Sequence, residues 1–125
     1  MKVPEELLYT KEHEWVQTAD TEVTIGITDF AQSQLGDIIF LELLEIGDKV
    51  VAGESFGEIE AVKTVSELYS PVNGVVTNVN ENLEDSTDNI NLDPYGTGWI
   101  IKVKFEDSLD SYDLLDIKAY ESFIG

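Results

Sequence analysis

The sequence predicts a mainly β domain, in which a sandwich or barrel of short antiparallel strands carries small helices at its periphery. Short apolar runs alternate with frequent turn residues, a pattern that is typical of such folds. At 125 residues with 42% hydrophobic side chains, the chain is long enough for one modest core. Helices with recognisable caps are expected near residue 30 and at the C-terminus.

The strands are expected to follow one another along the chain. His13 to Gln17 is expected to form a short strand that directs Trp15 inward. Alternation in Glu22 to Thr28 places Val23, Ile25 and Ile27 on one face. The β-branched and aromatic run from Asp37 to Leu44 predicts a buried strand. Further strands are expected at 49–52, 55–62, 65–69, 75–79 and 99–105, the last with Trp99, Ile101, Val103 and Phe105 on one face.

Turns and caps delimit these strands and two helices. Asn73-Gly74, between two apolar pairs, predicts a tight hairpin because both residues accept positive φ. Thr28 or Asp29 is expected to cap a helix over 30–35 that ends at Gly36. Residues 80–94 are polar and predict a loop with a helical turn. Helical spacing of Tyr112, Leu115, Ala119 and Phe123 predicts a C-terminal helix capped by Ser108 or Ser111.

Charge and composition exclude several classes of function. The formal net charge of −19 opposes binding to nucleic acid or to an anionic membrane and favours either basic protein partners or simple solubility. The absence of cysteine excludes disulfides and zinc–thiolate sites. No leader or presequence is recognisable. We therefore expect a cytoplasmic location if the source is bacterial, and the mitochondrial matrix only if a presequence has been removed.

Lys63 is a lone cation in an acidic segment. Glu58, Glu60 and Glu67 surround it, and it is expected at the tip between two strands. The segments 47–54 and 70–76 each place a turn glycine beside paired valines, roughly symmetrically about Lys63, although this match is too short to establish a repeat. Lys63 is therefore either an ordinary solvated side chain or a presented one.

No complete catalytic apparatus is recognisable. With one histidine and no Gly-x-Ser-x-Gly motif, neither a histidine-rich metal site nor a serine hydrolase site is expected. The acidic run from Glu81 to Asp93 lacks the spacing and glycine of an EF-hand, and no phosphate-binding glycine loop is present. His13 and Glu14 could form a base and its orienter, but adjacent strand residues point to opposite faces. We expect no catalytic residues and no metal site.

Residues 60–74, Glu-Ala-Val-Lys-Thr-Val-Ser-Glu-Leu-Tyr-Ser-Pro-Val-Asn-Gly, closely resemble the lipoylation segment of the glycine cleavage system H-protein family. The resemblance extends to 9–10, 13–15, 24–31, 35–40 and 91–100, and so covers nearly the whole chain in order. The neighbours of Lys63 also separate it from related carriers. Biotin carriers place the lysine between methionines and 2-oxoacid dehydrogenase domains use Asp-Lys-Ala, whereas this chain has Val62 and Thr64.

The resemblance implies a fold and a cofactor. The fold would be the barrel-sandwich hybrid of lipoyl and biotinyl domains: two antiparallel sheets with short flanking helices and a C-terminal helix. The single domain would span residues 1–125, with a lipoyl-binding core over about residues 22–104. Lipoate would be attached through an amide to Lys63 by a lipoate ligase or transferase. The sulfur chemistry that a cysteine-free chain lacks would then come from the cofactor.

The resemblance further implies a non-catalytic carrier. It would take the aminomethyl group of glycine from a pyridoxal-phosphate glycine decarboxylase to a tetrahydrofolate-dependent aminomethyltransferase, and dihydrolipoamide dehydrogenase would reoxidise it. Glu14 and Glu67 fall where the family contacts the loaded arm, and His13 is a third candidate for this cleft. Glu12 departs from the small hydroxyl residue that relatives often carry there. The alternatives are a lipoate relay that donates lipoyl groups to other complexes and a plain acidic interaction module.

Overall fold

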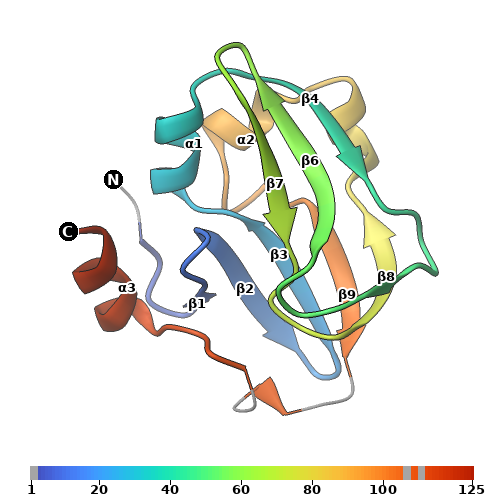
Figure 1. Cartoon of the computed structure of the whole chain (residues 1–125), viewed down its shortest axis with the longest axis vertical. Coiled ribbons are helices and arrows are strands. Elements are labelled where there is room, and N and C mark those ends of the chain that lie inside the picture. Colours follow the sequence, from blue (N-terminus) through green and yellow to red (C-terminus); the bar gives the residue numbers. More distant parts are fainter. Residues whose placement is uncertain (1–2, 106–107, 110–111) are drawn as a thin grey trace.

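Two antiparallel sheets make up the fold in the computed structural model, which describes residues 3–105, 108–109 and 112–125 (Figure 1). The larger sheet has the strand order β1-β2-β3-β9-β8-β5 and the smaller one β4-β6-β7. The larger sheet contains β1 (Leu8–Tyr9), β2 (Glu14–Ala19), β3 (Glu22–Ile27), β9 (Ile101–Phe105), β8 (Gly74–Val79) and β5 (Lys49–Val50). The smaller sheet contains β4 (Ile38–Leu43), β6 (Ser55–Ala61) and β7 (Val65–Tyr69). The expected two-sheet hybrid is confirmed, and across the described strands the two sheets do not close into one barrel.

Among the described residues, the elements that flank the sheets include α1 (Asp29–Leu35), the 3-10 turn η1 (Glu81–Glu84), α2 (Asn89–Leu92) and α3 (Ile117–Ile124). The predicted caps of α1 are confirmed. The Thr28 side chain accepts a hydrogen bond from the Ala31 amide, and the Gly36 amide donates to the Gln32 carbonyl at a φ of 80°. Positive φ favours glycine, which explains why this helix ends there.

The main core lies between the two sheets, and the period-two alternation builds it. Val23, Ile25 and Ile27 are buried on β3, as predicted, and Ile101, Val103 and Phe105 are buried on β9 beside it. A second, smaller cluster of Leu7, Tyr9, Trp15 and Tyr120 joins the N-terminal strands to α3. Trp15 points inward as predicted, and its Nε1–H donates to the Pro94 carbonyl at 2.9 Å.

The predicted hairpin at Asn73-Gly74 is wrong. Gly74 is the first residue of β8 and pairs with Phe105 of β9 and Val50 of β5, without positive φ. The Asn73 side chain instead accepts a hydrogen bond from the Ala52 amide at 2.8 Å. The two similar segments on either side of Lys63 thus contribute β5 and β8, which pair with each other.

The prediction of a buried strand over 37–44 is also wrong. β4 lies at the edge of the smaller sheet, so only Ile38 is buried while Ile39 and Phe40 are half exposed. An apolar run signals a strand, but it does not reveal how many neighbours cover that strand.

The C-terminal helix is shorter than predicted. It begins after Asp116, whose carboxylate accepts a hydrogen bond from the Ala119 amide at 2.8 Å. Leu115, predicted to lie in the helix, instead forms a β-bridge with Tyr9. The predicted cap Ser108 is not at the helix, and Ser111 lies outside the described residues.

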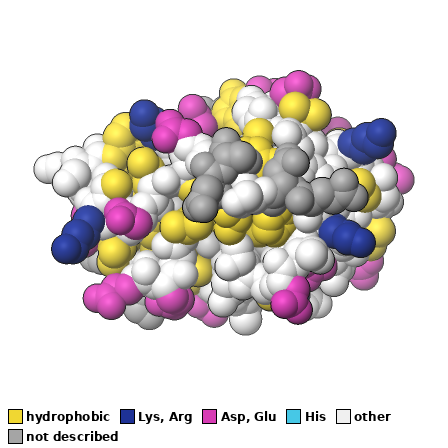
Figure 2. All heavy atoms as spheres, turned by 90° about the horizontal axis from the view of Figure 1, so that it is seen from below, with side chains coloured by type: hydrophobic (Ala, Val, Ile, Leu, Met, Phe, Trp, Pro, Cys, Tyr) yellow, Lys and Arg dark blue, Asp and Glu magenta, His cyan; other side chains and the backbone are white. Residues whose placement is uncertain are grey.

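The chain carries 26 acidic residues against seven lysines, so its surface has an excess of acids. Viewed from the end opposite the β6–β7 turn, hydrophobic side chains cross the middle, while acids and lysines lie around the rim (Figure 2). In the part of the chain that the structure describes, no helix has the length and apolar composition to cross a membrane.

Gly26→Ala is expected to reduce the free energy of unfolding by about 1–3 kcal/mol. A Cβ at this position would lie 2.6 Å from Trp15 Nε1, and the ring cannot move aside without losing its hydrogen bond to Pro94. Urea unfolding followed by tryptophan fluorescence measures the change. Gln17→Ala, at an exposed position on β2, is the control and should change stability by less than about 0.5 kcal/mol. Equal stability of both variants and wild type would contradict this packing.

Candidate functional site

The β6–β7 turn presents Lys63. Only Val62, Lys63 and Thr64 connect the two strands, and the Ala61 amide donates to the Thr64 carbonyl at 2.8 Å to close the turn. The Val62 amide donates to the Asp37 carbonyl at 3.1 Å, which ties the turn to the start of β4. Lys63 itself is exposed, and the turn projects at the top of the molecule (Figure 1). The predicted position of Lys63 at a hairpin tip is therefore confirmed.

Glu14 is buried: only 2% of the residue is accessible to solvent. Its Oε1 accepts a hydrogen bond from the Thr10 hydroxyl at 2.6 Å, and its Oε2 accepts one from the Tyr69 amide at 3.2 Å. Burial raises the pKa of Glu14 to about 8, because it penalises the charged form more than these two hydrogen bonds favour it. At neutral pH the group is therefore mainly a neutral acid.

Tyr69 brings the two candidate acids to the same place. Its backbone amide bonds to Glu14, and its hydroxyl donates to Glu67 Oε2 at 3.3 Å. The adjacent Glu67 carboxylate raises the pKa of the Tyr69 hydroxyl. Glu67 is exposed, whereas Glu14 is buried, so the site combines a solvated acid with a desolvated one at the end of β7.

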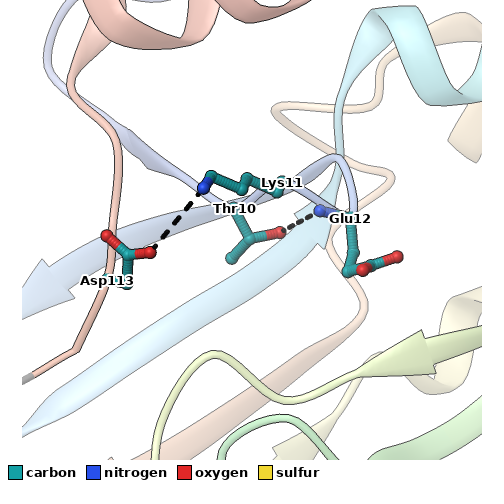
Figure 3. A network of polar contacts seen from close by, with 4 residues as sticks. All are labelled: Thr10, Lys11, Glu12 and Asp113. Carbon is teal, nitrogen blue, oxygen red and sulfur yellow. Dashed lines mark hydrogen bonds and ion pairs between the residues drawn. The ribbon is translucent and has the colours of Figure 1, made fainter.

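A turn at residues 10–14 orients the Thr10 hydroxyl toward Glu14. Thr10 Oγ1 accepts hydrogen bonds from the Glu12 amide at 3.2 Å and the Glu14 amide at 3.1 Å (Figure 3 shows the first). Glu12 is exposed, so the hydroxyl partner of Glu14 comes from Thr10. Sequence reasoning did not single out Thr10 for this role. The neighbouring Lys11–Asp113 pair, 3.9 Å apart and well exposed (Figure 3), contributes little to stability.

His13 makes its contacts elsewhere. Its backbone has a φ of 66°, and its Nδ1 lies 3.0 Å from the Tyr120 hydroxyl. The ring packs 4.7 Å from that of Phe30 and 5.7 Å from that of Phe123. Burial lowers the pKa of the imidazole. The structure thus joins Glu14 and Glu67 through Tyr69 and places the His13 ring against α1 and α3. Within the described ranges, no three His, Asp or Glu side chains are arranged to hold a metal ion.

Comparisons with known proteins agree over the whole chain. The model of the family described as "Glycine cleavage H-protein" matches residues 7–125. The chain is 54% identical to the glycine cleavage system H protein of Staphylococcus carnosus, over 100% of this chain and 99% of that protein. It is also 54% identical to the H protein of Listeria monocytogenes serotype 4a, over 99% of each chain. The crystal structure of an H protein from Mycobacterium marinum superposes with a TM-score of 0.88 at 39% identity, covering 96% of this chain and 97% of that one.

The buried acid predicts a distinct dependence of stability on pH. The pKa of Glu14 is raised in the folded state, so the folded protein binds a proton that the unfolded chain releases above its pKa of about 4.5. The contribution of Glu14 is complete below that value and is lost as the pH rises toward about 8. Urea unfolding of wild type and Glu14→Gln at pH 5, 7 and 9 isolates this group. The stability of wild type relative to the variant should fall across this range, and a constant difference would show that Glu14 is ionised throughout.

Proposed function

Because the chain belongs to the glycine cleavage H-protein family, we propose that it is the lipoyl carrier of the glycine cleavage system and holds lipoate on Lys63. It would shuttle the aminomethyl group of glycine from the pyridoxal-phosphate glycine decarboxylase to the tetrahydrofolate-dependent aminomethyltransferase. Dihydrolipoamide dehydrogenase would then reoxidise it. The single observation that carries this proposal is the exposed Lys63 at the tip of a closed hairpin.

The residues at the tip fit an amide-linked cofactor. The three-residue turn leaves the Lys63 side chain exposed, so a modifying ligase or transferase can reach the amine. The turn is held by backbone hydrogen bonds of Ala61 and Val62, which do not involve the Lys63 side chain. Modification therefore need not disturb the fold. Lipoate held there would supply a redox-active disulfide able to accept a group on one sulfur, chemistry that this cysteine-free chain lacks.

Glu14 and Glu67 suit the cationic amine of such a group. Glu67 offers an exposed carboxylate, and Glu14 offers a desolvated acid that is neutral in the absence of a cation. An ammonium group near Glu14 lowers the pKa of this acid, so Glu14 can release its proton and form an ion pair. The Thr10 hydroxyl donates to Glu14 Oε1 and the Tyr69 amide donates to Glu14 Oε2. Each carboxyl oxygen therefore already has a donor that stabilises negative charge on it. In this proposal His13 supports the wall of the cleft through α1 and α3 rather than touching the amine.

Lys63→Arg is expected to abolish both lipoylation and aminomethyl transfer, because guanidinium does not form the amide. Intact mass after incubation with a lipoate ligase should show a lipoyl increment for wild type and none for the variant. Exchange of the glycine carboxyl group with bicarbonate, catalysed by the decarboxylase, should require the lipoylated wild type. Circular dichroism checks that the variant is folded. Activity of a folded Lys63→Arg variant would end the proposal.

The same assay separates the shuttle from the lipoate relay. A lipoylated protein that passes lipoate to another carrier but does not support glycine decarboxylation would be a relay. A protein that accepts neither lipoate nor an aminomethyl group would be a plain acidic interaction module.

Loss of either acid is expected to shorten the life of the aminomethyl-loaded protein, because the amine loses its partner and the arm is more often exposed to water. Glu14→Gln and Glu67→Gln should release formaldehyde and ammonia at least about tenfold faster than wild type, for a lost charge-assisted contact of about 1.4 kcal/mol or more. Glu121→Gln, an exposed position on α3, is the matched control and should behave as wild type. Equal lifetimes in all four proteins would remove both acids from the proposed site.

A further inference from the structure

An apolar groove runs along the outer edge of β4, apart from the site at Glu14. It has a volume of about 760 Å³ and lies between β4 with its following turn on one side and the end of β8 with η1 on the other. Its apolar lining includes Ile39, Leu41, Leu43, Ile46, Val79 and Leu83, and we refer to it as the β4 groove. In Figure 1, β4 and η1 lie at the same end of the molecule as the β6–β7 turn.

The edge of β4 that faces away from β6 offers unused backbone hydrogen bonds. The Leu44 amide donates to the Phe56 carbonyl at 3.1 Å, which makes Leu44 and Phe56 a hydrogen-bonded pair. Because such pairs alternate in an antiparallel ladder, Leu41 and Leu43 present their N–H and C=O groups away from β6. In the described part of the chain, no strand pairs with this edge and no hydrogen bond reaches these two amides.

The side chains around this edge protect it only in part, because Glu42 is the one charged residue of β4 and its exposed neighbours are apolar. Ile39 and Ile46 are 50% and 59% exposed, although isolated edge strands are usually shielded by charges, proline or a covering element. Only the start of β4 is covered, where the Ile38 amide donates to the Asn91 side chain and the Thr87 hydroxyl donates to the Ile38 carbonyl. An exposed apolar lining beside an unpaired edge is typical of a site that receives an added strand.

The rim of the groove is acidic, which favours an occupant with positive charge. Glu45, Glu81 and Glu84 line its mouth, and every one of them is exposed. The groove contains no lysine. A matching segment therefore has apolar side chains at alternate positions, which enter the groove, and Lys or Arg beside them, which meet the three carboxylates.

The start of β4 lies next to the turn that holds the proposed carrier lysine. Ile38 pairs with Ala61, and the Asp37 carbonyl binds the Val62 amide, so β4 begins beside the turn that holds Lys63. We propose that the β4 groove is where an enzyme that acts on the arm of Lys63 anchors an extended, apolar and basic segment as an additional strand. This inference rests on the proposed function for the identity of the partner.

Hydrogen exchange of the full-length protein tests the added strand. The protein is mixed in turn with purified glycine decarboxylase, aminomethyltransferase and dihydrolipoamide dehydrogenase, and exchange is read at single amides by NMR. At least one enzyme should slow exchange of the Leu41 and Leu43 amides by about tenfold or more. Val65 and Glu67 are the internal control, because they present their amides at the opposite edge of the same sheet. Protection confined to that opposite edge, or none with any of the three enzymes, would overturn the proposal.

Charge-matched variants test the groove lining. Ile39→Lys and Ile46→Lys each place a cation among the apolar side chains that would receive the segment. With the enzyme that gives protection, each should raise the half-saturating concentration about tenfold, the loss expected for an interface anchor. Val51→Lys adds the same charge at a 47% exposed valine outside the groove and should have no such effect. Equal half-saturation for all three variants and wild type would contradict the groove as the docking site.

The two proposals fail separately. If the Leu41 and Leu43 amides are protected in a protein that never accepts an aminomethyl group, the docking proposal stands and the shuttle proposal is wrong. If Ile39→Lys and Ile46→Lys transfer the aminomethyl group fully, with the half-saturating concentration of wild type, the shuttle proposal stands and the docking proposal is wrong. Unchanged unfolding midpoints confirm that the variants are folded, as expected at half-exposed positions.

Discussion

The buried carboxyl group of Glu14 joins the two sheets at the place where the site is built. Glu14 belongs to β2 of the larger sheet, and its side chain accepts hydrogen bonds from the Thr10 hydroxyl and from the Tyr69 amide of β7. Because a buried acid without these donors would carry a large desolvation cost, the three groups are held in one arrangement. The lysine hairpin is therefore anchored to the larger sheet through an ionisable group rather than through apolar contacts alone.

The two edges of the smaller sheet consequently differ. On β7, the outward amide of Tyr69 is used by Glu14, and Glu67 and the Tyr69 hydroxyl lie beside it. On β4, the outward edge faces an apolar groove with an acidic rim. Lys63 lies at the tip of the β6–β7 hairpin and next to the start of β4. The β7 edge and the β4 edge are the two opposite edges of the sheet that carries this tip. In the two proposals, the β7 edge is the polar surface that receives a cationic amine and the β4 edge is the apolar surface that receives a partner protein.

Much of the fold could be predicted because its signals are local. The alternation in β3 and β9, the caps of α1 and the position of Lys63 between two short strands all depend on neighbours within a few residues. The hairpin predicted at Asn73-Gly74 is wrong because strand pairing of Gly74 with Val50 and Phe105 outweighs its preference for a turn. The C-terminal helix was predicted to be too long. Leu115 stands at helical spacing, but its backbone groups pair with those of Tyr9 in a β-bridge.

The sequence by itself determined the sheet-forming segments, the family resemblance and the lysine that the hairpin presents, because each is written in contiguous residues and their spacing. Only the tertiary structure decided that Glu14 is buried with a raised pKa, that Thr10 rather than Glu12 supplies its hydroxyl partner, and that β4 is an open edge. Burial, pKa and edge position depend on which distant segments pack together. For Glu14 the decisive neighbour is Tyr69, 55 residues along the chain.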